Sequence, residues 1–257
     1  MRWQQTPGSA PHRASRQMSG ERCGLYSLDA ASGAPAIVMG QISISGRRRR
    51  DTVQSRELAL VISGASGSAL AIRFAQTALE TGAVDILHLV VTGPGGKVLA
   101  HEVGSEWSSP RGFRDQLRVS EELRSRIQPW TDSELSSPIA SGSHLLSGVV
   151  VLPCSAGMAG SLAHGISRGL SQRVADVAIK QRWPLVLGIR ESPMSQILLD
   201  NLSKLASTGA HIVPPMPAFY LKPGEADQWD TFVDHYVVRV LDLLHIPVDR
   251  KELRWAP

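Results

Sequence analysis

One stretch constrains the fold more than any other: an apolar run that breaks into small residues just before a helical pattern. Residues 58–62 are short, aliphatic and uncharged, which is typical of a strand buried on both faces of a parallel sheet. Residues 63–68 contain no bulky side chain, so a ligand can approach the backbone there, and the start of the following helix favours an anion. We expect a phosphate at this turn; the alternative is a turn kept small for packing alone. The stretch lacks the third glycine of a dinucleotide fingerprint and the Gly-Lys-Ser/Thr of a P-loop.

The same pattern recurs along the chain. Further aliphatic runs predict strands at 86–91, 149–152, 184–189 and 211–213. Helical patterns separate these runs, whereas residues 104–137 are polar and predict an exposed excursion with a helix near 113–127. Strands that alternate with helices predict an α/β fold: a doubly wound parallel sheet in three layers, of the Rossmann or flavodoxin type. Ligands bind such sheets beyond the carboxyl ends of the strands, where this chain gathers hydroxyl, thiol and charged side chains.

The composition predicts one domain and a tail. The chain has 257 residues, of which 42% are hydrophobic, enough for one sizeable core. Residues 1–56 are rich in Gly, Ser, Pro and Arg, and we expect a disordered extension before a folded domain at 57–257. The extension could instead be a transit peptide, an anion-binding segment through Arg47 to Arg50, or the result of a misassigned start. We expect a cytoplasmic protein, or a mitochondrial one if the extension is a transit peptide.

Several classes of protein are excluded. No apolar run approaches the roughly 20 residues of a membrane span. The two cysteines, Cys23 and Cys154, rule out a disulfide framework and thiolate-rich metal sites, and the histidines show no metal-ligand spacing, so we expect no metal. The net charge of +4 is concentrated in the tail, and three Tyr and four Phe are too few for a nucleic-acid stacking surface.

Cations and hydroxyl groups around one carboxylate point to a phosphorylated ligand. The candidate residues are Ser66, Arg173, Lys180, Arg190, Glu191, Tyr220 and Arg239. Plainer interpretations stay open for some of them. Arg173 and Lys180 could form a solvated helix stripe, and Arg239 could extend from an amphipathic helix towards water. Cys154 is best interpreted as a small buried hydrophobe.

Six tracts, taken in order, resemble the UbiX/Pad family of flavin prenyltransferases. They are Ile62-Ser63-Gly64-Ala65-Ser66-Gly67, Ala140-Ser141-Gly142-Ser143, Leu152-Pro153-Cys154-Ser155, residues 173–180, residues 184–193 and Pro214-Pro215-Met216-Pro217-Ala218-Phe219-Tyr220. The resemblance implies a homododecameric, metal-independent transferase that joins a dimethylallyl group from dimethylallyl monophosphate to N5 and C6 of reduced FMN. The product, prenylated FMN, would serve UbiD-type decarboxylases.

The resemblance also implies roles for individual residues. The FMN-binding residues would be Gly64, Ala65, Ser66, Thr92, Ser141 and Arg173, with Ser66 near flavin N5 and Thr92 near the phosphate. The donor phosphate would be held by Lys180, Arg190, Tyr220 and Arg239, while Glu191 would transfer protons and Glu102 would support the site.

The chain departs from the family pattern at Gly93-Pro94, which stands where the family commonly has Ser/Thr-Lys and a small residue. Two rival functions stay open, and this departure favours only the second of them. One is an FMN-dependent cysteine-type decarboxylase of the same fold, although neither its active-site histidine nor its Asn-containing loop is found at Pro153 to Gly157. The other is a non-catalytic FMN-binding subunit of an aromatic acid decarboxylase.

Overall fold

A parallel sheet forms the centre of the computed structural model, which describes residues 55–221 and 228–255. Its six strands lie in the order β3-β2-β1-β4-β5-β6. They are β1 (Glu57–Ile62), β2 (Ile86–Val91), β3 (Ile127–Thr131), β4 (Gly148–Cys154), β5 (Leu185–Ile189) and β6 (His211–Ile212). The order reverses between β1 and β4, and the crevice at such a reversal is where doubly wound sheets bind ligands. The predicted fold class is confirmed.

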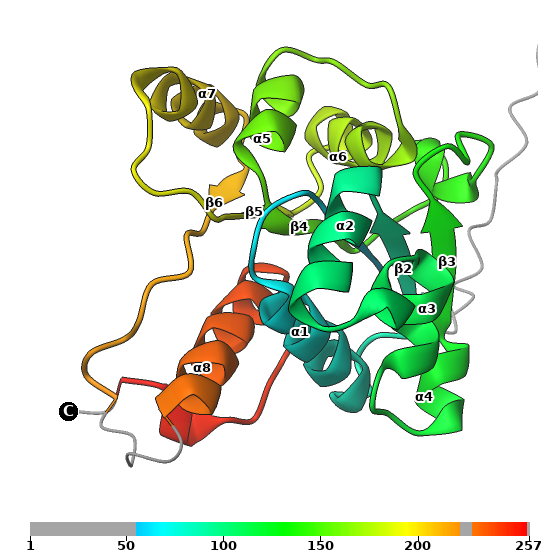
Figure 1. Ribbon diagram of the computed structural model, residues 1–257, viewed down its shortest axis with the longest axis vertical. Coiled ribbons are helices and arrows are strands. Elements are labelled where there is room, and N and C mark those ends of the chain that lie inside the picture. Colours follow the sequence, from blue (N-terminus) through cyan, green and yellow to red (C-terminus); the bar gives the residue numbers. More distant parts are fainter. Residues whose placement is uncertain (1–54, 222–227, 256–257) are drawn as a thin grey trace, which may run out of the picture. The chain divides into compact units, whose positions relative to one another are not determined.

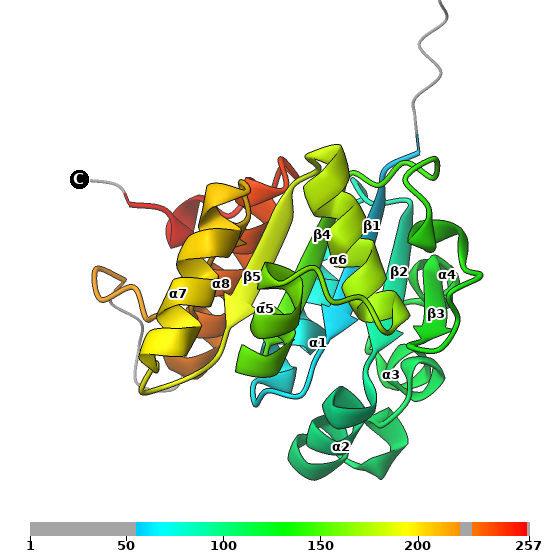
Figure 2. The ribbon, with the colours of Figure 1, turned by 90° about the horizontal axis from the view of Figure 1, so that it is seen from above.

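Helices cover both faces of the sheet (Figures 1 and 2). One face packs against α1 (Ser68–Glu80), α3 (Pro110–Gln116) and α8 (Gln228–Leu243), and the other against α5 (Ala156–Ala163), α6 (Leu170–Gln181) and α7 (Gln196–Ser207). The remaining helical segments are α2 (Gly93–Glu102), α4 (Glu121–Ser125) and short 3-10 turns at Ser105–Trp107, Pro138–Ala140 and Lys251–Leu253.

Strand β1 shows why the sheet has helices on both sides. Leu58, Leu60 and Ile62 face the α1–α8 layer, whereas Ala59 and Val61 face the α5–α6 layer. All five are almost completely buried, as the uncharged run predicted.

The segment between β2 and β4 differs from the expectation. A single helix near residues 113–127 is wrong: the chain forms α3, α4 and then the edge strand β3. Strand β3 has the sequence Ile-Gln-Pro-Trp-Thr and pairs with β2 alone, so Pro129 is tolerated and only Ile127 is buried. An edge strand of this kind lacks the aliphatic run that identified the central strands.

Residues 1–54 lie outside the described part of the chain, so the disordered extension and the domain boundary stay predictions. Strand β1 begins at Glu57, where the folded domain was expected to begin. Among the described residues, no helix is both long and apolar enough to cross a membrane.

Candidate active site

The carboxyl ends of β1 and β4 are joined by the side chain of Ser63. Its hydroxyl donates to the Pro153 carbonyl oxygen at 2.9 Å and accepts from the Ser155 backbone N–H at 2.8 Å. Ser63 is 1% exposed, and its own N–H also donates to the Pro153 oxygen. The reversal point of the sheet is therefore held by a short buried hydrogen-bond network.

A cavity of about 560 Å³ opens beside this network. Its walls come from the turns after β1, β2, β3 and β4 and from the start of α6. The lining residues are Ser63, Gly64, Thr92, Pro94, Asp132, Ser133, Ser155, Gly157, Met158, Ser161, Arg168, Gly169, Ser171 and Gln172. Small and hydroxyl-bearing side chains dominate, as the polar tips of the strands predicted. Of the predicted FMN-binding residues, Gly64 and Thr92 line this cavity.

The turn after β2 packs closely against the turn after β1. A Cβ atom added to Gly64 would lie 2.5 Å from the Pro94 Cβ, so glycine is needed at position 64 for packing against Pro94. The Thr92 hydroxyl accepts from the Gly95 N–H at 3.0 Å and donates to the Ile62 carbonyl at 3.2 Å. Thr92 thus caps α2, and Pro94 removes one backbone donor from the start of that helix.

The backbone N–H groups at the start of α1 are hydrogen-bonded to a carboxylate of the protein itself. Glu102 accepts from the N–H of Ser68 at 2.8 Å and from the N–H of Gly67 at 3.1 Å. Burial works against ionisation of Glu102, but hydrogen bonds from the Ser66 side chain and from these two N–H groups hold its pKa below the usual value. Glu102 therefore occupies the helix start at which a phosphate was expected, and a phosphate elsewhere in this turn stays a prediction.

Two further helices, α5 and α6, begin at the cavity, and at each start a protein side chain accepts a hydrogen bond from a backbone N–H group. Ser155 accepts from the Met158 N–H at the start of α5, and the Asp132 carboxylate accepts from the Ser171 N–H at 2.8 Å at the start of α6. Among the residues that line the cavity, the cation is Arg168. Sequence reasoning missed Arg168, although a cation directly before Gly169 and a helix is a readable signal for an anion.

Other predicted residues lie in separate groups. Arg190 and Glu191 are exposed directly after β5; the Arg190 N–H donates to the Cys154 carbonyl, and the Glu191 carboxylate accepts from the Ser192 N–H at 3.1 Å. The Arg173 guanidinium donates to the Ala140 carbonyl at 2.9 Å and pairs with Asp176 at 3.1 Å, beside Ser141.

Residues near the C-terminus form the third group. The Tyr220 hydroxyl lies 2.8 Å from the His235 Nε2 atom, and Arg239 follows one turn later on α8, where it pairs with Asp242 at 3.4 Å. Lys180 is exposed near the end of α6, about 14 Å along the helix axis from Ser171 at its start. The structure thus brings Ser66 to Glu102 and Tyr220 to His235, one turn before Arg239 on α8, but it does not bring Lys180 to the cavity within one copy.

At the amino end of the sheet, Glu57 joins two histidines that are distant in sequence. Its carboxylate lies 2.8 Å from the His88 Nε2 atom and 2.9 Å from the His144 Nε2 atom. The Trp130 indole N–H donates to the His88 Nδ1 atom at 3.1 Å, which leaves the proton of neutral His88 on Nε2. If a metal were bound at Nε2, the proton of neutral His88 would have to lie on Nδ1. There it would face the Trp130 N–H, which is also a donor. The hydrogen bonds of this cluster therefore suit a structural role, in which Glu57, His88 and His144 hold their segments together, better than they suit a metal centre.

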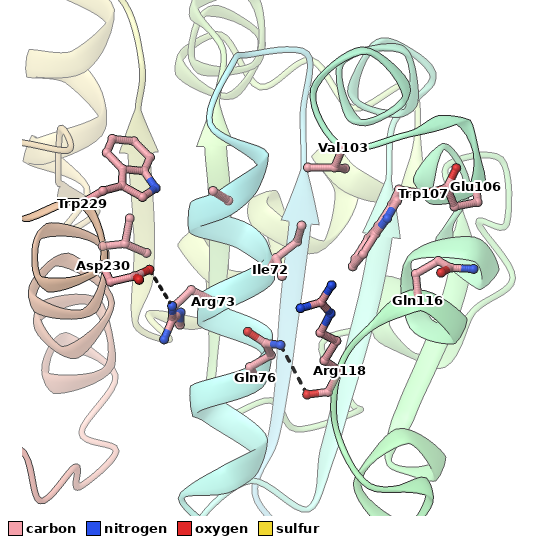
Figure 3. Close-up of a pocket in the computed structure, with 12 residues that line it drawn as sticks. Ile72, Arg73, Gln76, Val103, Glu106, Trp107, Gln116, Arg118, Trp229 and Asp230 are labelled. Carbon is pink, nitrogen blue, oxygen red and sulfur yellow. Dashed lines mark hydrogen bonds and ion pairs between the residues drawn. The ribbon is translucent and has the colours of Figure 1, made fainter. Parts of the chain in front are cut away.

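A second hollow, of about 520 Å³, lies along the outer side of α1 (Figure 3). Trp107 and Trp229 stand at its two sides, and Arg73 pairs with Asp230 and Asp234, both at 3.0 Å. Within the described chain, none of the predicted site residues lines this hollow.

Known proteins match the chain over nearly all of the described part. The family model Flavoprotein matches residues 46–241. The flavin prenyltransferase UbiX of Aquifex aeolicus is 37% identical over 194 residues, which cover 74% of this chain and 94% of that protein. The corresponding protein of Methanocaldococcus jannaschii is 33% identical over 190 residues, which cover 74% of this chain and 94% of that protein.

Solved structures agree with these relatives. A UbiX protein crystallised with FMN and dimethylallyl pyrophosphate has a TM-score of 0.65 at 29% identity and covers 79% of this chain and 99% of its own. A dodecameric FMN-dependent UbiX-like decarboxylase from Escherichia coli O157:H7 has a TM-score of 0.64 at 30% identity, over 78% of this chain and 100% of its own. The chain belongs to the flavoprotein family and, within it, to the UbiX flavin prenyltransferases.

Proposed function

We propose that this chain transfers a dimethylallyl group from dimethylallyl monophosphate to reduced FMN bound at the carboxyl edge of the sheet. The observation that carries the proposal is the 37% identity to a flavin prenyltransferase over 194 residues, in a chain whose reversal point opens into a cavity of about 560 Å³. Small, hydroxyl-bearing walls suit the close approach of a planar ring and its hydroxylated side chain.

The acceptor side of the site would use Ser66 and Glu102. Glu102 holds the start of α1 and the Ser66 side chain in place, beside the backbone of Gly64 and Ala65. The FMN phosphate needs a cation, because the helix starts at the cavity are already capped by protein side chains. Arg168 is suited to this role, since it extends from the cavity wall and is exposed.

Reduced FMN supplies nucleophilic N5 and C6 atoms to this reaction. The allylic C–O bond of the donor would break and its electron pair would leave with phosphate, while a carbon–nitrogen bond forms at N5 and the N5 proton passes to the phosphate. The remaining C=C double bond would then take up a proton, and C6 would bond to the resulting carbocation and lose its own proton, so that the flavin gains C5H8 and the reaction balances. Cations around the leaving oxygens stabilise this charge separation, for which Lys180, Arg190 and Arg239 are the candidates. Glu191 would carry the proton, and Ser141 and Arg173 would support the flavin.

The donor site would be completed by neighbouring copies of the chain. Lys180 lies about 14 Å along α6 from the cavity wall, too far for one copy to use it at its own cavity. The dodecameric relative supports such an assembly. We further propose a UbiD-type decarboxylase as the recipient of the product.

The decisive experiment is anaerobic incubation of the purified protein with reduced FMN and dimethylallyl monophosphate, followed by mass analysis of the released flavin. A mass gain of one C5H8 unit is expected. Bound but unmodified FMN would contradict the transferase function, and a protein that binds no FMN would contradict the site itself.

A further inference from the structure

Tyr220 is held between two aromatic rings at the C-terminal end of the chain. Its ring makes edge contacts with His235, at 5.7 Å between ring centroids, and with Trp255, at 5.3 Å. His235 is 9% exposed, whereas Tyr220 is 41% exposed. The tyrosine therefore faces solvent on one side and rests on a buried imidazole on the other.

The environment of His235 fixes its protonation state. Burial and the positive charge of Arg239, one turn along α8, both lower the pKa of His235, so the ring is neutral at pH 7 and carries one proton. Its Nδ1 atom is buried and has no hydrogen-bond partner among the described residues. A proton on Nδ1 would be an unpaired buried N–H group, whereas a proton on Nε2 is used in the 2.8 Å hydrogen bond to Tyr220.

The direction of this hydrogen bond decides what Tyr220 can offer a ligand. A tyrosine has one O–H group, and phosphate oxygens need a donor. If the Tyr220 hydroxyl donated to His235, only lone pairs would face the phosphate. If His235 donates, the tyrosine proton is free.

We infer that His235 is a positioning residue for the prenyl donor: its Nε2–H donates to the Tyr220 oxygen, so that the Tyr220 O–H points at a phosphate oxygen of dimethylallyl monophosphate. The inference rests on the proposed function, in which Arg239 holds the donor, and on the donor-binding role that the family resemblance implies for Tyr220. The resulting chain of hydrogen bonds also polarises the tyrosine O–H and strengthens its contact with the anion.

The test is calorimetric titration of dimethylallyl monophosphate into the assembled protein loaded with oxidised FMN, which does not react. His235→Phe keeps an aromatic ring but removes the donor, and we expect Kd for dimethylallyl monophosphate to rise about tenfold, the effect of losing one hydrogen bond to a charged group. His235→Gln, whose amide can donate, should recover most of the affinity. Kd for FMN, measured in parallel, should be unchanged in both variants.

A double-mutant cycle separates positioning from a general structural role. Because His235 acts through the Tyr220 hydroxyl, adding His235→Phe to Tyr220→Phe should weaken donor binding no further. Losses that multiply, or a Kd for His235→Phe equal to that of the unmodified protein, would overturn the inference alone. If the unmodified, FMN-loaded protein does not bind dimethylallyl monophosphate, the donor site of the proposed function is overturned, and the inference with it.

Discussion

Replacing Ser63 by alanine tests the hydrogen-bond network at the reversal point of the sheet. The substitution leaves the Ser155 N–H without the acceptor that it now has at 2.8 Å. The Pro153 carbonyl loses one donor but keeps the Ser63 N–H at 3.2 Å, so only the part-buried Ser155 N–H is orphaned. An unsatisfied buried donor costs about 1–3 kcal/mol. We expect the free energy of unfolding to fall by about 2 kcal/mol, which lowers Tm by about 4–8 °C for a domain of this size.

The assay is denaturant and thermal unfolding at one fixed protein concentration, because assembly would make stability depend on concentration. Ser161→Ala is a matched control: Ser161 lines the same cavity, but its hydroxyl only donates to the Gly157 carbonyl within its own helix, at 2.9 Å. Its effect should stay within about 0.5 kcal/mol. Equal effects of the two substitutions, or a Ser63→Ala protein as stable as the original, would refute the reasoning.

Four further predictions concern the proposed site and the buried thiol of Cys154. Arg168→Gln should raise Kd for FMN by about tenfold or more but leave Kd for riboflavin unchanged, because riboflavin has no phosphate; equal losses in a flavin fluorescence titration would contradict the role of Arg168. Glu191→Gln should keep FMN bound and abolish prenylation measured by mass, and unchanged turnover would remove Glu191 from the mechanism. Lys180→Ala should raise KM for the donor and spare FMN affinity, whereas loss of both ligands would argue for a structural role. Burial raises the pKa of the Cys154 thiol to about 12, so iodoacetamide at pH 8 should modify Cys154 only after unfolding; rapid alkylation of Cys154 in the folded protein, told apart from that of Cys23 by peptide mass, would contradict that burial.

The central strands were predictable because burial on both faces demands uninterrupted aliphatic runs, as at residues 58–62. Strand β3 was missed because an edge position tolerates Pro129 and polar side chains, which removes that signal. The strand tips indicated where the cavity lies, since parallel strands end at a common edge.

Pairings across the chain were harder to foresee. Nothing local in the sequence shows that Glu102 caps the start of α1, and this long-range contact replaced the anion that the helix start predicted. His88 and His144 likewise meet at Glu57 through the topology of the sheet rather than through spacing. The roles assigned to Ser141, Lys180 and Arg239 rest on family resemblance and stay predictions.

The contact between Gly64 and Pro94 restricts the order in which this sequence can change. Any side chain at position 64 meets Pro94 at once, so Gly64→Ala is penalised while Pro94 is present. The clash is with the Cβ atom at position 94, which every residue except glycine carries, so Pro94→Gly is the change that makes room for the alanine. In evolution or in engineering, position 94 must therefore become glycine before position 64 can gain a side chain.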